Sequence, residues 1–118
     1  MTKRNEQTGS EIELRLLAKL HVSPDVSQRG LAADLGVSLG SVNYCLKALV
    51  MKGFVKAESF SKSPNKLGYA YLLTPSGIAA KSRLTASFLK RKQAEYNRLE
   101  KEIAVLQAQV QKDKAAGH

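Results

Sequence analysis

The sequence predicts a mainly α-helical fold with one small β-hairpin, and three features support that prediction. Two short amphipathic segments are joined by Gly36-Val37-Ser38, which has the length and turn chemistry of a helix-turn-helix. Two strand-like segments follow and flank a polar, basic stretch. From Ile78 to Ala116 the chain then contains neither proline nor glycine, as expected of one long helix. This order of elements is a winged helix-turn-helix followed by a long C-terminal helix.

The first helix is predicted to begin at Ser10, because Ser10 and Glu13 have the spacing of a capping box. Apolar residues then recur at helical spacing as far as Leu20, and Pro24 lies in the loop that follows. Residues 1–9 are polar, and we expect them to form a disordered N-terminus.

The second and third helices carry clear boundary signals. Ser27 is a suitable N-cap for a helix over 28–35, and Gly36 follows where a left-handed residue ends a helix. Ser38 is a suitable N-cap for the third helix, which we place at 39–52.

The hairpin is predicted from two strands, 54–60 and 69–73, with a turn over 61–67 that contains Ser, Pro, Asn and two Lys. The last helix is predicted to begin at Thr74-Pro75, which pairs an N-cap with a proline at the first helical position. We therefore expect a winged helix-turn-helix domain over 10–75, a dimerisation helix over 76–112 and a frayed tail over 113–118.

The positive charge of the chain is concentrated in its middle. The net charge is +9, and residues 27–92 hold eleven Lys and Arg against only Asp34 and Glu58. Such a segment attracts a polyanion through its long-range field and through counterion release. A solvated basic surface without a partner is the alternative, but its coincidence with the predicted helix-turn-helix favours double-stranded DNA.

The third helix is the candidate recognition helix. Its apolar spacing predicts a buried face made of Val42, Cys45, Leu46 and Leu49. The opposite face carries side chains that suit base edges and phosphates, although the same pattern also describes a solvated helix face. The candidate DNA-binding residues of this helix and its cap are Ser38, Ser41, Asn43, Tyr44 and Lys47. Further candidates are Gln28 and Arg29 on the second helix and Lys62, Asn65 and Lys66 at the tip of the wing.

Several segments resemble MarR-type winged-helix regulators: 27–32, 35–38, 42–49, 52–56 and 71–78, and the last of these contains the more specific element Leu73-Thr74-Pro75-Ser76-Gly77. Within that family, 42–49 and 65–75 are most similar to the EPS-associated subgroup, which is linked to exopolysaccharide gene clusters. The resemblance implies a cytoplasmic homodimer that binds a palindromic operator with one recognition helix in each major groove. It also implies a function in transcription regulation, of repressor type. The wing carries Asn65-Lys66 where MarR wings usually carry an Asp-x-Arg pair.

The long last helix carries an apolar seam with heptad spacing, interrupted by Lys92. Its members, which we expect to mediate dimerisation, are Leu89, Tyr96, Leu99, Ile103, Leu106 and Val110. Packing of this helix on its own domain is the alternative. A parallel pair of helices places Glu95 against Glu100 of the partner, so antiparallel and splayed arrangements both stay open.

The residues that enzymes and metal sites require are missing from the sequence. It has two His and one Cys, too few for a zinc site of usual spacing, and no Gly-rich phosphate loop or nucleophile elbow. We therefore expect no enzyme activity and no cofactor. The single Cys45 suits a reducing compartment, and a core thiol is favoured over a redox sensor. We expect no secretory signal and no membrane span, because no long apolar run follows the charged N-terminus.

Two other readings of the same elements are a winged-helix adaptor that binds proteins without specific DNA binding and a nonspecific architectural DNA binder. An adaptor is expected to expose apolar residues on the third helix, whereas an architectural protein binds all duplexes with similar affinity.

Overall fold

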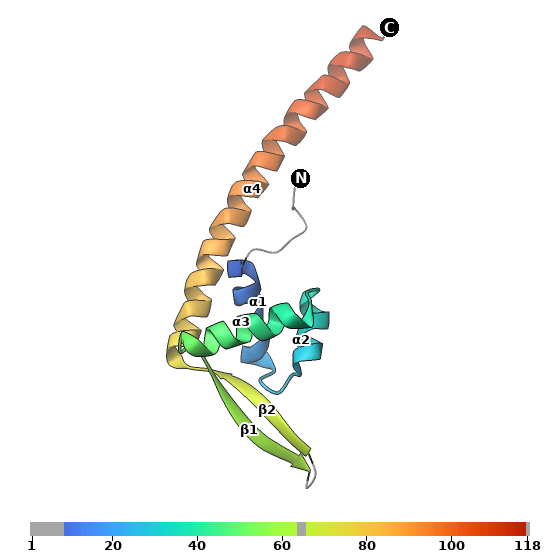
Figure 1. The fold of residues 1–118 in the computed structure, drawn as a ribbon. Coiled ribbons are helices and arrows are strands. Elements are labelled where there is room, and N and C mark those ends of the chain that lie inside the picture. The colour runs from blue at the N-terminus through green and yellow to red at the C-terminus, as the bar shows by residue number, and fades with distance from the viewer. Residues whose placement is uncertain (1–8, 64–65, 118) are drawn as a thin grey trace. The chain divides into compact units, whose positions relative to one another are not determined.

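The structure is a computed structural model that describes residues 9–63 and 66–117, without the side chains of residues 60–69. The chain divides into two units, Met1–Thr85 and Ala86–His118. The described elements, in chain order, are α1 (Gly9–Val22), α2 (Gln28–Leu35), α3 (Leu39–Met51), β1 (Val55–Ser63), β2 (Lys66–Leu73) and α4 (Pro75–Ala116) (Figure 1). This order confirms the mainly helical fold with one hairpin and a long last helix.

The core of the first unit lies among α1, α2 and α3. All three helices contribute fully buried leucines, which confirms the apolar spacing found in the sequence. The buried apolar residues are Leu16, Leu17, Leu20, Leu31, Leu35, Val42, Leu46, Leu49, Val55 and Ala80. The capping-box prediction for α1 was wrong, because the helix already includes Gly9 and Ser10 lies inside its first turn. Glu13 instead forms an ion pair with Lys52 after the end of α3, with 2.6 Å between Nζ and Oε2.

The turn between α2 and α3 has the predicted chemistry. Ser27 caps α2 by accepting a hydrogen bond from the Gly30 amide at 3.0 Å. Gly36 ends α2 with φ of 70°, a left-handed conformation that glycine adopts without strain. Ser38 then caps α3 by accepting from the Ser41 amide at 3.0 Å. The third helix ends at Met51, one residue before the predicted end.

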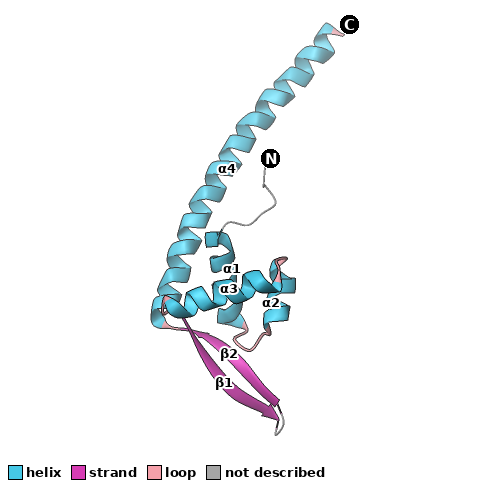
Figure 2. Cartoon of the chain, in the orientation of Figure 1, coloured by secondary structure: helices cyan, strands magenta, loops and turns pink. Residues whose placement is uncertain are grey.

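The hairpin is longer than the sequence predicted. Strands β1 and β2 pair antiparallel, from Val55 opposite Leu73 to Ser63 opposite Lys66, with an irregularity between Ser61 and Ser63. The predicted turn over 61–67 was therefore too long, because the backbone ladder continues through Ser and Lys residues that favour turns on composition alone. The strands extend away from the three helices (Figure 2).

The base of the hairpin is joined to the start of α4 by a compact set of contacts. Thr74 caps α4 by accepting from the Gly77 amide at 3.1 Å, and its own hydroxyl donates to the Gly53 carbonyl at 2.5 Å. The Thr74 amide donates to the Phe54 carbonyl at 3.0 Å. Gly77 is buried, and a Cβ at this position is only 1.9 Å from the Phe54 carbonyl oxygen. The Thr-Pro-x-Gly segment therefore starts α4 directly after β2 and contacts the two residues that precede β1.

Candidate nucleic-acid interface

The third helix presents the two faces predicted for it, with one difference. Val42, Leu46 and Leu49 are fully or almost fully buried, whereas Tyr44 is 76% exposed and Lys47 is exposed. The remaining core candidate of this helix, a cysteine, is only half-buried. A cationic and an aromatic side chain thus project from the face opposite the core.

The two serines at the start of α3 bind each other. The Ser38 hydroxyl accepts from the Ser41 amide, and it also donates to the Ser41 hydroxyl at 3.0 Å. Ser38 is exposed and Ser41 half-buried, so Ser38 lies at the surface of the first helical turn. Unsatisfied amides in the first turn of a helix favour an anionic group such as phosphate.

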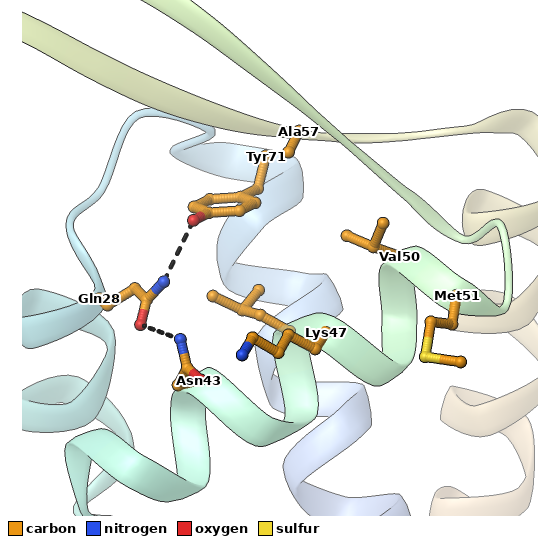
Figure 3. A pocket seen from close by; sticks show the side chains of 8 residues that line it. Gln28, Asn43, Lys47, Val50, Met51, Ala57 and Tyr71 are labelled. Atoms are coloured by element: carbon orange, nitrogen blue, oxygen red, sulfur yellow. Dashed lines mark hydrogen bonds between the residues drawn. The ribbon is translucent and has the colours of Figure 1, made fainter.

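Asn43 lies in a short chain of hydrogen bonds that joins three elements (Figure 3). Its Nδ2 donates to Oε1 of Gln28 on α2 at 3.2 Å. Nε2 of Gln28 in turn donates to the hydroxyl of Tyr71 on β2 at 3.1 Å. The backbone of Tyr71 is itself held by the loop between α1 and α2, because the Tyr71 amide donates to the Pro24 carbonyl at 2.9 Å. Two of the candidate DNA-binding residues, Gln28 and Asn43, are therefore brought together.

A hollow of about 410 Å³ lies between α3 and the hairpin, beside these hydrogen bonds. Its walls also include Val50 and Met51 at the C-terminal end of α3, which are 40% and 88% exposed. The helix therefore presents polar residues in its first turns and apolar residues in its last turn. The apolar end was not anticipated from the sequence.

The structure describes only part of the remaining candidate DNA-binding residues, on α2 and the wing. Arg29 is exposed at the start of α2. Lys62 lies on β1 and Lys66 on β2, but their side chains are not among those that the structure describes. Asn65 lies outside the described residues. The predicted disordered N-terminus also falls outside the described residues, apart from Gly9.

The second unit consists of the part of α4 from Ala86 onward, and the helix continues to Ala116, beyond the predicted end near residue 112. All six residues of the predicted seam are exposed by 51% or more. Val105, which is 68% exposed, lies next to the seam and was not assigned to it. Near the start of this unit, the Arg91 and Lys92 cations lie 5.3 and 5.1 Å from the centre of the Phe88 ring.

Burial raises the pKa of the Cys45 thiol, and the negative charge of Glu13 adds to this effect while Lys52 opposes it. A raised pKa keeps the thiol protonated and poorly nucleophilic at neutral pH. The prediction of an inert thiol over a redox sensor is consistent with this environment, although Cys45 is half-buried rather than fully buried.

Some residues at this interface were missed in the sequence. Leu39, the first residue of α3, is 41% exposed, at the end of the helix where recognition helices contact base edges. Tyr71 was assigned only to a strand, yet its hydroxyl reaches Gln28. The contact of Tyr71 with Gln28 joins distant segments, and the spacing of residues within one segment does not predict it. Leu39 could have been noted, because the sequence places an apolar residue directly after the predicted N-cap.

No helix in the described part of the chain is both long and apolar enough to cross a membrane. The same residues contain no group of three or more His, Cys, Asp or Glu placed to hold a metal ion.

Comparison with known proteins supports the fold of the first unit. Residues 10–56 match the sequence profile of a family described as winged helix-turn-helix DNA-binding. This match covers α1, the helix-turn-helix and the first residues of the hairpin. The first unit therefore has the winged helix-turn-helix fold. A comparison with curated proteins found no match.

Three solved structures with a similar fold share less than 20% sequence identity with this chain. The smu.1704 protein of Streptococcus mutans shares 18% identity with a TM-score of 0.64, over 72% of this chain and 82% of that one. A MarR transcriptional regulator from Methanosarcina mazei shares 17% identity with a TM-score of 0.60, over 74% of this chain but only 61% of its own length. A MepR mutant of S. aureus bound to an oligodeoxyribonucleotide shares 19% identity with a TM-score of 0.57, over 98% of this chain and 83% of that one.

Proposed function

We propose that this protein is a sequence-specific, DNA-binding transcription regulator of the MarR type. One observation carries the proposal: the basic segment of the chain coincides with a winged helix-turn-helix whose recognition helix exposes Lys47 and Tyr44. Lys47 suits a guanine edge or a phosphate, Tyr44 a phosphate, and Asn43 an adenine edge. The family match to residues 10–56 and the DNA-bound fold neighbour support the same assignment. Binding, rather than catalysis, is the activity proposed.

The proposed binding mode places α3 in the major groove and the hairpin along the neighbouring backbone. Ser38 and Ser41 begin the helix that enters the groove, and Arg29 on α2 is the candidate for a flanking phosphate. Lys62, Asn65 and Lys66 are proposed for the wing on the basis of their position in the chain.

We also propose that the protein acts as a homodimer through the seam of α4. Six apolar residues lie at heptad spacing along this helix, and each is at least half exposed. A helix surrounded by water does not need such a seam, whereas a helix that packs against a second helix does. Burial of one such side chain contributes about 1.5–3 kcal/mol. A dimer also doubles the number of recognition helices, as a palindromic operator requires.

The finer assignments depend on the resemblance of 42–49 and 65–75 to the EPS-associated subgroup. On that basis we propose that the protein acts in the cytoplasm as a repressor of genes for exopolysaccharide synthesis.

A binding titration tests the proposal against the adaptor alternative. The full chain is titrated into a labelled duplex pool of mixed sequence at increasing salt concentration. We expect binding whose affinity falls steeply with salt, by about 10³-fold or more between 50 and 200 mM if at least six phosphates are contacted. Absence of salt-dependent binding to duplex DNA contradicts the proposal and favours the adaptor.

A further inference from the structure

We propose that Gln28 and Tyr71 are positioning residues that orient the amide of Asn43 toward a base edge. Strand β2 of the wing and the recognition helix α3 then contribute together to sequence recognition. This inference rests on the proposed function, since it assigns how the same surface gains its specificity.

The three side chains come from segments that lie far apart in the chain. Asn43 comes from α3, Gln28 from α2 and Tyr71 from β2, and two hydrogen bonds of 3.2 and 3.1 Å join them in series (Figure 3). The backbone that carries the phenol is held in turn, because the Tyr71 amide donates to the Pro24 carbonyl at 2.9 Å. The orientation of Asn43 therefore depends on the position of the hairpin.

The amides have open space on one side. All three residues border the hollow of about 410 Å³ between α3 and the hairpin, and all three are only half-buried. Close packing on that side is missing, so the hydrogen bonds rather than neighbouring atoms determine which way the Asn43 amide faces. Removal of one bond leaves room for the amide to rotate.

The two amides differ in how their hydrogen-bonding groups are used within the protein. A carboxamide has two N–H donors and an oxygen with two lone pairs. Asn43 uses one N–H on Gln28 and keeps the other, together with its Oδ1, for the paired donor and acceptor of adenine. Gln28 has both its Oε1 and its Nε2 engaged within the protein, which makes it less available than Asn43 for a bidentate contact with a base, and we assign it to positioning.

A fixed amide gives tighter binding to the correct sequence, because no side-chain rotation has to be frozen on binding. Loss of this preorganisation lowers the affinity for the preferred duplex by about three- to tenfold. Affinity for mixed-sequence DNA depends on phosphate contacts, and so does not change.

The test uses Tyr71→Phe, which removes the hydroxyl and keeps the ring. The preferred duplex is obtained by selection from random sequence, and affinities are measured for that duplex and for a mixed-sequence pool. We expect Tyr71→Phe and Gln28→Ala to lose about three- to tenfold for the preferred duplex only. In an Asn43→Ala background, Tyr71→Phe is expected to have no further effect. Gln111→Ala, at an exposed position of α4, is the matched control and is expected to bind like the unchanged protein.

Equal losses for both kinds of duplex, or additive effects of Tyr71→Phe and Asn43→Ala, overturn the inference. A second readout separates this failure from failure of the proposed function. Side-chain amide NMR signals of Asn43 and Gln28 are recorded without DNA, and we expect them to shift in Tyr71→Phe. Unchanged signals overturn the hydrogen-bond chain, whether or not the protein prefers any DNA sequence.

Discussion

Gly77→Ala is the substitution whose effect on stability follows most directly from the structure. A Cβ built at Gly77 lies 1.9 Å from the oxygen and 2.9 Å from the carbon of the Phe54 carbonyl. Real Cβ atoms do not approach heavy atoms within 3.0 Å, so the strand start and the helix start have to separate by about 1 Å. These atoms belong to backbone and cannot rotate away.

The magnitude follows from the hydrogen bonds that this separation disrupts. Thr74 donates twice, to the Phe54 and Gly53 carbonyls, and the Ser76 hydroxyl donates to the Gly53 carbonyl at 3.0 Å. Each bond contributes about 1 kcal/mol net, or about 3 kcal/mol together. The better helix propensity of Ala offsets about 1 kcal/mol. We therefore expect Gly77→Ala to lower the free energy of unfolding by about 2 kcal/mol, balancing these opposing effects.

Thermal and urea unfolding, both at one protein concentration, measure this loss. A loss of about 2 kcal/mol corresponds to a fall in Tm of roughly 10 °C for a unit of this size. Gly40→Ala is the matched control, because the nearest heavy atom to its added Cβ is the Ser38 hydroxyl at 3.9 Å. The control is expected to be more stable than the unchanged protein by up to about 1 kcal/mol, from the same helix propensity. If Gly77→Ala were as stable as Gly40→Ala, the contact between Phe54 and the start of α4 would be refuted.

Three further predictions concern DNA, assembly and the thiol. Lys47→Ala and Asn43→Ala are expected to lower specific affinity by about 1–3 kcal/mol each in operator titrations, and unchanged binding in both refutes the assignment of α3. Truncation after Ala94 removes five of the six seam residues, so sedimentation should show weaker self-association; a full-length monomer at micromolar concentration contradicts the dimer. The raised pKa of Cys45 predicts slower alkylation at pH 8 than in the unfolded chain, with the rate rising at higher pH; equal rates in both states contradict the burial of the thiol.

The elements that sequence reasoning predicted well are those whose signals are local. Ser27, Ser38 and Thr74 each accept a hydrogen bond from an amide three residues ahead, so the residue type at one position predicts the start of a helix. The left-handed Gly36 is local in the same sense.

The elements that were missed depend on segments far apart in the chain. The extent of the hairpin follows from pairing between two strands, and paired backbone groups tolerate Ser and Lys at exposed positions. The need for glycine at position 77 arises from the carbonyl of Phe54, more than twenty residues earlier. Ser10 and Glu13 have the spacing of a capping box, but the helix starts before Ser10, and the Glu13 carboxylate pairs with Lys52.

The candidate site shows the same division. The polar face of α3 was predicted from helical spacing, and Tyr44 and Lys47 are exposed on it. The link from Asn43 through Gln28 to Tyr71 was not predicted, since it depends on how the hairpin packs beside two helices. The spacing of residues predicts which face of the helix is exposed, but it does not predict which distant residue orients a side chain on that face.

Selection of bound sequences from random duplex DNA by the full chain tests the central claim most directly. We predict enrichment of a palindrome whose half-site centres lie about 10 base pairs, or one helical turn, apart. The enriched duplex is expected to bind at least about 10³-fold more tightly than the starting pool. An enriched pool that binds no more tightly than random DNA would contradict the account.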